Sequence, residues 1–551
     1  SLGDTSPMIV KSLVSLIFAL VTLPACTAWP IIAQQPTTPT ISTLSLPPTP
    51  IPVATLPLTP APATIPPTTT LAPSPTPNIA EVNFTDLTPY HRAMRPEFTG
   101  DVDQVAAAGA THYYIEAILD FPSGDTGGEV RLMGSEQIRY TNTETTPLDD
   151  IYFRLYPNLP GYGGQMTVST VWVNDQPVMP VLEADDTVLR APLSSPLLPG
   201  ESATVTLDFE AQLPNETQGG YNIFSYSNGT AALANFYPAV AVYDDEGWDI
   251  DIPPPYGDAT YLDTALFHVE LTIPQAMIVA ASGSVIDSTI NENGTQTLLL
   301  ASGPMRDFYI AMREDFQIAS ETVDGVTVNS YYPPELAEGG QLALRYAADA
   351  LALFNERFGP YPFAEFDVVA TPTTAGGVEY PGIVVISENL YGQSGGFFEH
   401  ATVHEVAHQW WYSLVGNDQI DDPWLDESLT NYSTIFYWET FGGPNAGESV
   451  IEGYFFGPYE AAQERVGDRA VTGPVSAYTE GEYSAFVYGK GPLFFNALRQ
   501  EVGDEVYFDI MHTYLTEFKY KIATANDLFA IIEQKSGQNV EPLLETWLEP
   551  R

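Results

Sequence analysis

Basic side chains are scarce in this sequence of 551 residues. It has 19 Lys and Arg against 70 Asp and Glu, which gives a formal net charge of -51 at pH 7. Charged residues make up only 16% of the chain, below the roughly 25% of an average soluble protein, so the acidity arises from missing cations. A surface of this sign repels nucleic-acid phosphates and anionic lipid headgroups. We therefore expect no nucleic acid partner and no electrostatic binding to a membrane.

Cysteine is nearly absent, and its position is informative. Cys26 is the one cysteine, so no intramolecular disulfide can form. The apolar run over residues 13–23 before it is too short to span a bilayer and is typical of a secretory signal. The letters LPAC resemble a bacterial lipobox, from which Pro24 departs. We expect a signal peptide over residues 1–26 and lipidation at Cys26. The protein would then be extracytoplasmic, held at the outer face of a bacterial membrane only through this lipid, or otherwise secreted.

Residues 27–80 lack the composition of a folded segment. They are dominated by Pro and Thr, as in PTTPTISTLSLPPTPIP. Proline fixes φ and removes a backbone donor, which excludes helix interiors and central strands. We predict an extended linker with a rise of about 3.1 Å per residue.

Two patterns divide the rest of the chain. Short runs such as EVRLMGSEQIRYTN and LFHVELTIP alternate apolar and polar residues, with turn signals between them, and predict an all-β, sandwich-like domain over residues 81–325. Residues 326–551 mix strands with helices and predict an α/β-to-α domain. Its expected strands are FDVVATP and GIVVIS, and its expected helices cover residues 341–359, 402–415, 424–440, 488–501, 505–518 and 527–534.

Histidine is also rare, with 7 in the chain, yet two stand four residues apart in His404-Glu405-Val406-Ala407-His408. On a helix this spacing places both imidazoles on one face, where they can bind one metal ion. Glu405 lies beside the metal and can take a proton from water. His400 continues the series, but it lies about 12 Å from His408 along the helix axis, so one ion cannot bind all three histidines.

A third ligand is expected from the helix that follows. After the polar loop NDQIDD the chain returns in WLDESLTNYSTIFYW, which places Glu427 opposite the histidine pair. Asp426 is the nearest alternative, and its side chain points about 100° away around the helix. Asn431, one turn further on, is either a partner of a ligand or a polar surface residue. Two imidazoles and a carboxylate are a typical catalytic zinc set, with a fourth position left for water.

The segment HEVAHQWWYSLVGNDQIDDPWLDESLTNYS resembles the zinc aminopeptidases related to aminopeptidase N, in the gluzincin clan. The resemblance implies a thermolysin-like catalytic domain, one Zn²⁺ per chain and Glu427 as the third ligand. GGVEYPGIV is similar to the family's G-[AG]-M-E-N motif, with Val378 in place of Met and Tyr380 in place of Asn. It implies that Glu379 binds the substrate's α-ammonium and that the strand with Gly376 and Gly377 pairs with the peptide.

A further resemblance concerns VYGKGPLFF, which is similar to the family segment Y-x-K-G with its catalytic tyrosine, here Tyr488. It implies that this phenol stabilises the oxyanion of the tetrahedral intermediate; Tyr483 is the alternative. Long family members continue into a helical domain over the active site. This sequence stops 63 residues after Tyr488, which leads us to expect a more open cleft.

Together these features predict a zinc aminopeptidase that removes N-terminal residues from peptides, with Glu405 as general base. Two alternatives stay open. The imperfect exopeptidase motif and the expected open cleft also suit a zinc endopeptidase. A cell-surface binding protein with a vestigial peptidase site is the other alternative.

Overall fold

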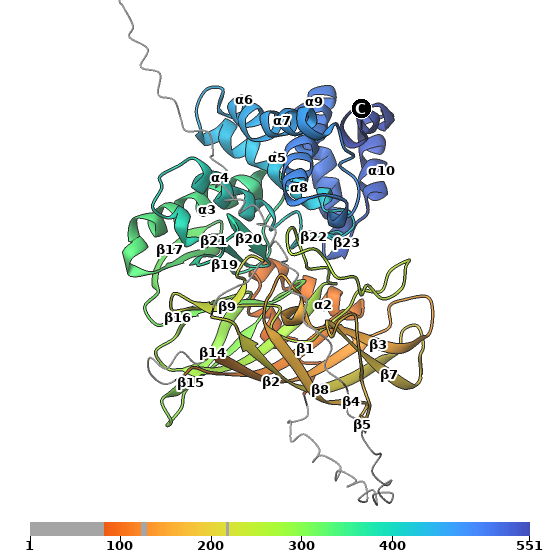
Figure 1. Cartoon of the computed structure of the whole chain (residues 1–551), viewed down its shortest axis with the longest axis vertical. Helices are drawn as coiled ribbons and strands as arrows, with labels where there is room; N and C mark the ends of the chain where they lie inside the picture. Colours follow the sequence, from red (N-terminus) through yellow and green to blue (C-terminus); the bar gives the residue numbers. More distant parts are fainter. Residues whose placement is uncertain (1–81, 123–128, 216–219, 551) are drawn as a thin grey trace, which may run out of the picture. The chain divides into compact units, whose positions relative to one another are not determined.

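The computed structural model describes residues 82–122, 129–215 and 220–550. The predicted signal peptide, the lipidation site Cys26 and the Pro/Thr-rich linker lie outside these residues. Two short helices, α1 (Thr88–His91) and α2 (Thr99–Ala107), come before the first strand (Figure 1). Among the described residues, no helix combines the length and the apolar character that a bilayer crossing requires.

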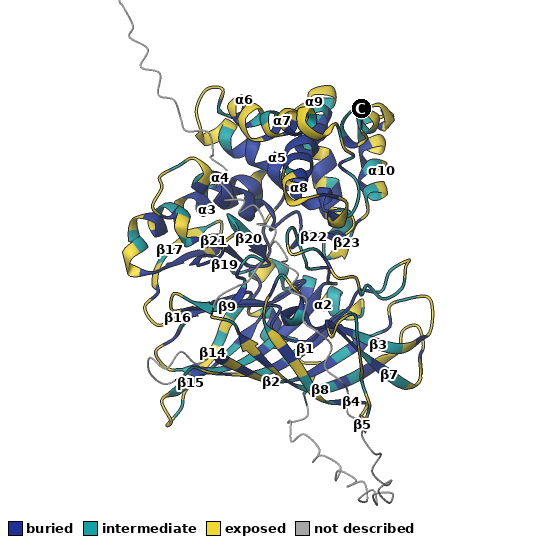
Figure 2. Ribbon diagram, in the orientation of Figure 1, coloured by how far each residue is buried: buried dark blue, intermediate teal, exposed yellow. Residues whose placement is uncertain are grey.

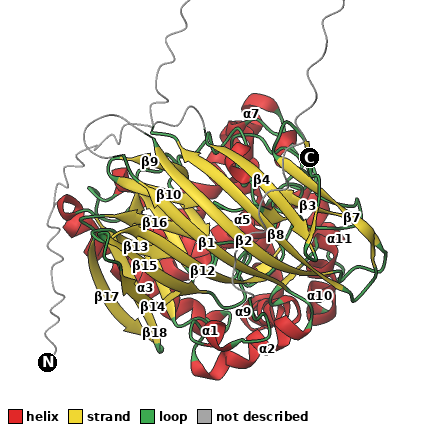
Figure 3. Ribbon diagram, turned by 90° about the horizontal axis from the view of Figure 1, so that it is seen from below, coloured by secondary structure: helices red, strands yellow, loops and turns green. Residues whose placement is uncertain are grey.

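The largest sheet has eight strands in the order β14-β15-β12-β1-β2-β8-β4-β5, and its long strands lie side by side in Figure 3. Side chains along β8 alternate between buried and more exposed positions, as expected of a sheet with one face in the core. The strands are β1 (Thr111–Asp120), β2 (Val130–Thr141), β4 (Gln165–Val173), β5 (Gln176–Pro177), β8 (Ser202–Leu213), β12 (Ala265–Pro274), β14 (Ser284–Ile290) and β15 (Thr295–Ala301).

Two four-stranded sheets complete the β region. Tyr113 of β1 accepts a hydrogen bond from the backbone N–H of Val240 in β11 at 2.9 Å, which joins the large sheet to one of them. The predicted β-rich domain is therefore confirmed. The first small sheet contains β13 (Ile278–Ala281), β16 (Tyr309–Arg313), β10 (Thr230–Ala234) and β9 (Phe224–Ser227), and the second contains β11 (Ala239–Val240), β3 (Leu148–Arg154), β7 (Val188–Leu197) and β6 (Val181–Glu183).

A five-stranded sheet begins the second part of the chain, in the order β17-β18-β19-β21-β20. Helix α3 (Ala337–Arg357) connects two parallel neighbours, and β20 lies at one edge, antiparallel to β21. The expected domain boundary between residues 325 and 326 falls in the turn between β17 and β18, so β17 belongs by pairing to the second part. The strands are β17 (Gln317–Val323), β18 (Val326–Tyr332), β19 (Glu365–Thr371), β20 (Gly377–Tyr380) and β21 (Ile383–Ser387).

Helices follow this sheet, and they confirm the predicted change from α/β to α structure. Buried side chains extend from the sheets into α4 and α5 as one continuous core (Figure 2). A short strand pair also occurs here, β22 (Val415–Gly416) with β23 (Lys521–Ile522). The helices are α4 (Phe397–Ala407), α5 (Trp424–Phe441), α6 (Ala446–Val450), α7 (Gly457–Val466), α8 (Glu480–Ala485), α9 (Gly491–Phe518), α10 (Ala525–Ser536) and α11 (Glu541–Leu543).

One predicted helix was wrong in its extent. Helix α4 ends at Ala407, not at residue 415. The indole N–H of Trp410 donates to the carbonyl of Gly359 at 2.9 Å, and that of Trp411 donates to Ser433 Oγ at 3.0 Å. The two indoles thus bond to different segments of the chain. The backbone then reaches φ 154° at Tyr412, which is incompatible with a helix.

The ends of two later helices were predicted well. At Gly503 the backbone of α9 leaves helical geometry, with φ 77°, so the expected pair of helices over 488–501 and 505–518 meets there. Thr524 accepts a hydrogen bond from the Asp527 N–H, and the Asp527 carboxylate accepts one from the Thr524 N–H. This is a capping box with Asp in the place of Glu, and it begins α10 two residues before the expected start at residue 527.

Candidate active site

Three of the predicted side chains converge between α4 and α5. His404 Nε2 lies 3.1 Å from His408 Nε2 and 3.1 Å from Glu427 Oε2, and His408 Nε2 lies 3.4 Å from the same oxygen. His404 is in the last turn of α4, His408 caps that helix, and Glu427 is in the first turn of α5. All three side chains are buried. The antiparallel return predicted from the sequence therefore places Glu427 opposite the histidine pair.

These separations fit a zinc ion. Tetrahedral ligands at about 2.0–2.1 Å from zinc lie about 3.3 Å from one another, and the three measured distances are 3.1, 3.1 and 3.4 Å. His408 Nδ1 lies 3.0 Å from the carbonyl oxygen of Trp411. Because a carbonyl only accepts, Nδ1 carries the proton, and Nε2 presents its lone pair to the shared point. Orientation of this kind by a backbone carbonyl is usual for metal-binding histidines.

Two other groups of the described residues bring three possible ligands within 4.8 Å of one another. One contains Glu379, Glu405 and His408, and the other contains Asp258, Glu379 and Asp426. Neither provides two imidazoles. The set of His404, His408 and Glu427 is therefore the best match to zinc among them.

The alternatives weighed from the sequence have other partners. His400 Nε2 lies 3.1 Å from Asn431 Oδ1, and its ring stacks on Tyr454 at 4.4 Å. Burial, with His404 nearby, lowers the pKa of His400 to about 3, so this ring is neutral. Asn431 is buried and also donates to the Tyr488 carbonyl at 2.8 Å, which excludes the reading of a polar surface residue. Asp426 accepts from Gln419 at 2.5 Å.

Glu405 faces the edge strand β20 at very short range. A Cβ atom on Gly377 would lie 2.4 Å from Glu405 Oε1, so only glycine permits this approach. Glu405 is buried, and burial together with Glu379 raises the pKa of its carboxyl well above the usual value. A carboxyl beside the histidine pair with a raised pKa can both accept and return a proton. Gly376 lies beside Phe397, which its Cβ would meet at 3.1 Å.

Tyr488 reaches the same centre from the turn of π-helix between α8 and α9. Its hydroxyl donates to Glu427 Oε1, and its ring stacks on His404 with 5.7 Å between centroids. Burial, with Glu427 adjacent, raises the pKa of Tyr488, so the phenol stays a hydrogen-bond donor. Tyr483 packs edge-on against Tyr488 at 5.7 Å, and its hydroxyl has no partner among the described residues.

Glu379 forms the inner end of the site. It is buried, and Gln419 Nε2 donates to its Oε1 at 3.3 Å. Asp258, from the loop before β12, lies within 4.8 Å of Glu379 and Asp426. Sequence reasoning missed Asp258 and Gln419. Gln419 stands in the polar loop already noted, but no pattern marks Asp258, which comes from the β region.

A cavity of about 420 Å³ joins these groups. Its lining includes Glu379, Asp258, Glu405 and His404, together with Phe397 and Tyr454. Strand β20 lies along it, and as an edge strand it leaves one side of its backbone free to pair with an extended peptide. The arrangement provides a metal-ligand set, a proton acceptor, a phenol donor and a carboxylate at one end of a peptide-sized space.

The sequence was compared with known protein families. Residues 342–547 match the profile of the peptidase family M1 domain. The chain carries a peptidase family M1 domain. The matched region contains all six side chains described above, namely Glu379, His404, Glu405, His408, Glu427 and Tyr488.

Several curated proteins that this chain resembles are aminopeptidases. Aminopeptidase M1 of Arabidopsis thaliana is 26% identical over 380 residues, which cover 64% of this chain and 41% of that protein. Aminopeptidase M1-A of Oryza sativa subsp. japonica is 24% identical over 369 residues, with the same shares. Aminopeptidase N of Lactococcus lactis subsp. lactis is 27% identical over 250 residues, or 42% of this chain and 29% of that protein. The chain thus spans about two fifths of the first two relatives.

Solved structures share the fold. The M1 zinc metallopeptidase from Deinococcus radiodurans superimposes with a TM-score of 0.61 at 22% identity, over 80% of this chain and 94% of that one. A related two-domain M1 zinc metallopeptidase, solved as a mutant bound to L-arginine, gives the same TM-score and identity. The predicted β domain followed by a gluzincin-type domain is thereby confirmed as the fold.

Proposed function

We propose that the protein is a zinc-dependent aminopeptidase that removes N-terminal residues from peptides. The observation that carries this proposal is the convergence of His404 Nε2, His408 Nε2 and Glu427 Oε2 within 3.4 Å of one another, beside a cavity lined by His404, Glu427 and the Glu379 carboxylate. The matched M1 domain and the aminopeptidase relatives support it.

The side chains divide the chemistry among them. A zinc ion held by His404, His408 and Glu427 would act as a Lewis acid toward the scissile carbonyl and lower the pKa of water toward 7. Glu405 takes the proton of the attacking water and returns it to the leaving amine. Tyr488 donates its phenol hydrogen to the oxygen on which negative charge develops.

Specificity for the N-terminus follows from the other end of the cavity. The buried Glu379 carboxylate accepts hydrogen bonds from an α-ammonium, and with an acetylated terminus it stays desolvated without a cation. The free edge of β20 holds the peptide backbone, so its first carbonyl lies beside Glu405. One residue is then released at a time. For the segment outside the described residues we keep the proposal of secretion and lipidation at Cys26.

The test compares one hexapeptide with its N-terminus free and acetylated, each incubated with the enzyme and analysed by mass spectrometry. We expect stepwise loss of single residues from the free peptide and no cleavage of the acetylated one. Glu379→Gln should raise KM for the free peptide at least tenfold. Internal cleavage of both peptides would assign a zinc endopeptidase instead. Cleavage of neither would favour a binding protein with a vestigial site.

A further inference from the structure

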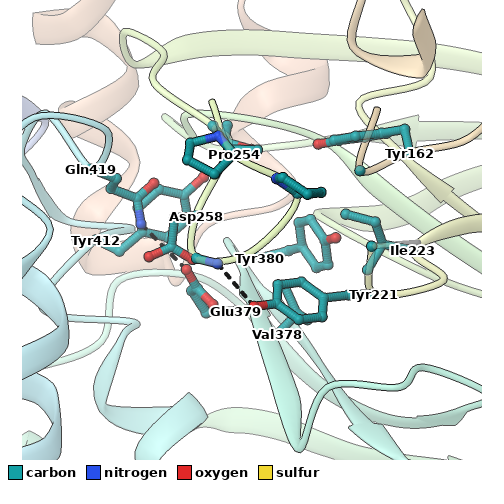
Figure 4. Close-up of a pocket in the computed structure, with 16 residues that line it drawn as sticks. Tyr162, Tyr221, Ile223, Pro254, Asp258, Val378, Glu379, Tyr380, Tyr412 and Gln419 are labelled. Atoms are coloured by element: carbon teal, nitrogen blue, oxygen red, sulfur yellow. Dashed lines mark hydrogen bonds between the residues drawn. The ribbon is translucent and has the colours of Figure 1, made fainter. Parts of the chain in front are cut away.

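A second cavity adjoins Glu379, and neither His404 nor His408 lines it. Its volume is about 50 Å³, and it shares Tyr221, Gly257, Asp258, Val378 and Glu379 with the larger cavity. The two spaces therefore meet at the group that we assign to the substrate's α-ammonium. Figure 4 shows Tyr162, Ile223 and Pro254 around the space beyond Glu379. Apart from the carboxylates at its mouth, this cavity is mostly apolar.

Its aromatic walls are held in place by hydrogen bonds. Tyr162 donates to Asn235 Oδ1 at 2.8 Å, and Tyr221 accepts from the Gly257 N–H at 2.8 Å. Tyr412 donates its hydroxyl to the buried Asp307. A wider pocket would require these rings to leave buried partners, and each polar group left buried and unpaired would destabilise the fold. The volume is therefore a property of the folded site.

A cavity of this size admits a short side chain. An apolar cavity of about 150 Å³ is known to hold benzene, and this one has about a third of that volume. It has room for a methyl or isopropyl group but not for a phenyl ring or the extended chain of Lys or Arg. Burial of the two additional carbons of an isopropyl group beside Ile223 and Pro254 is favourable because it removes apolar surface from water.

We propose that this cavity binds the side chain of the substrate's first residue and selects short aliphatic N-termini, alanine to valine in size, over aromatic and basic ones. The inference rests on the proposed function, because it takes Glu379 as the anchor of the α-ammonium. An amino acid bound there has its carbonyl toward the metal-ligand set and its side chain toward Ile223. Size selection comes from the three anchored tyrosines, Tyr162, Tyr221 and Tyr412.

The experiment measures kcat/KM of the zinc-loaded full chain for Ala-, Val-, Phe- and Lys-p-nitroanilide. We expect the Ala and Val substrates to exceed the Phe and Lys substrates at least tenfold. Equal or faster turnover of the Phe or Lys substrate would overturn the proposal while leaving the aminopeptidase assignment intact. If no substrate is cleaved, the proposed function fails. The selectivity is then tested by calorimetric binding of alaninamide and phenylalaninamide, where tighter binding of phenylalaninamide overturns it.

A matched pair of variants places the selectivity in this cavity. Ile223→Ala removes three carbons from the wall and should raise the Phe-to-Ala ratio of kcat/KM about tenfold. Ile286→Ala makes the same change at another half-buried isoleucine, on β14 at the edge of the large sheet, and should leave the ratio unchanged. An unchanged ratio in Ile223→Ala, with its melting temperature equal to that of Ile286→Ala, would overturn the assignment of this cavity.

Discussion

The Nε2 atoms of His404 and His408 lie 3.1 Å apart. Glu427 Oε2 lies 3.1 Å from the Nε2 atom of His404 and 3.4 Å from that of His408. Three buried groups in this arrangement have their lone pairs directed at one point. We predict that the purified protein holds one zinc ion and that His404→Ala lowers its zinc affinity at least a hundredfold. The measurement is zinc content after dialysis against a competing chelator, read by atomic emission.

His400→Ala is the control for this prediction, because His400 is on the same helix one turn earlier and bonds to Asn431. It should keep one zinc per chain under the same dialysis. If His400→Ala loses zinc and His404→Ala retains it, then His400 is a zinc ligand and His404 is not. This result would contradict the assignment of zinc to His404 and His408.

Glu405 is predicted to act on protons and not on the metal. Glu405→Gln keeps the size of the side chain but cannot accept a proton from water. Turnover of a free-N-terminus peptide should fall about 10²- to 10⁴-fold, while zinc content stays at one per chain. Turnover equal to that of the unmodified protein would remove Glu405 from the reaction.

Tyr488→Phe removes only the phenol oxygen. Because the hydroxyl acts on the charge of the transition state, kcat should fall about 10²- to 10³-fold with little change in KM. Tyr483→Phe is a matched change at the ring packed against it, whose hydroxyl has no partner among the described residues, and should cost much less. A larger loss in Tyr483→Phe would exchange the roles of the two tyrosines.

Glu136, in the β region, is predicted to make stability depend on pH. Both its oxygens are buried without a hydrogen-bond partner among the described residues, and burial raises its pKa well above the usual value. The folded state therefore keeps a proton that the unfolded chain releases above about pH 4.5. Each further pH unit costs the folded state about 1.4 kcal/mol until the folded pKa is reached.

Glu136→Gln removes this titration, so its free energy of unfolding relative to the unmodified protein should increase from pH 5 to pH 8. Urea unfolding at several pH values measures the difference. Glu210→Gln, an exposed position on β8, should follow the unmodified protein at every pH. If the free energy of unfolding of Glu136→Gln also follows that of the unmodified protein at every pH, the fold does not hold the Glu136 carboxyl protonated.

The parts of the site that were predictable from the sequence depend on residues that are close together in the chain. His404 and His408 lie in consecutive turns at one helix end, so helix geometry brings them together. Glu427 begins the next helix, and its position was predicted from the antiparallel return of the chain and from the family resemblance. The capping box at Thr524 likewise depends only on residues three apart in the sequence. The end of α4 was missed because the anchors of Trp410 and Trp411, at Gly359 and Ser433, are remote in sequence.

The remaining parts depend on which distant segments pair. Strand β1 pairs in parallel with β12, with Thr111 opposite Ala265, and alternation of apolar residues cannot specify such a partner. This strand order brings the loop with Asp258 to Glu379. The walls around Ile223 depend on it too. Hence the set of His404, His408 and Glu427 was predictable from the sequence, while the second cavity beside Glu379 was not.

Metal dependence of N-terminal cleavage tests the central claim most directly. The protein is stripped with chelator, and release of the first residue from a free peptide is followed as zinc is added back. We predict no release without zinc, a linear rise and saturation at one zinc per chain, with no recovery in Glu427→Ala at the same zinc concentrations. Full activity in the stripped protein, or full recovery in Glu427→Ala, would contradict the account.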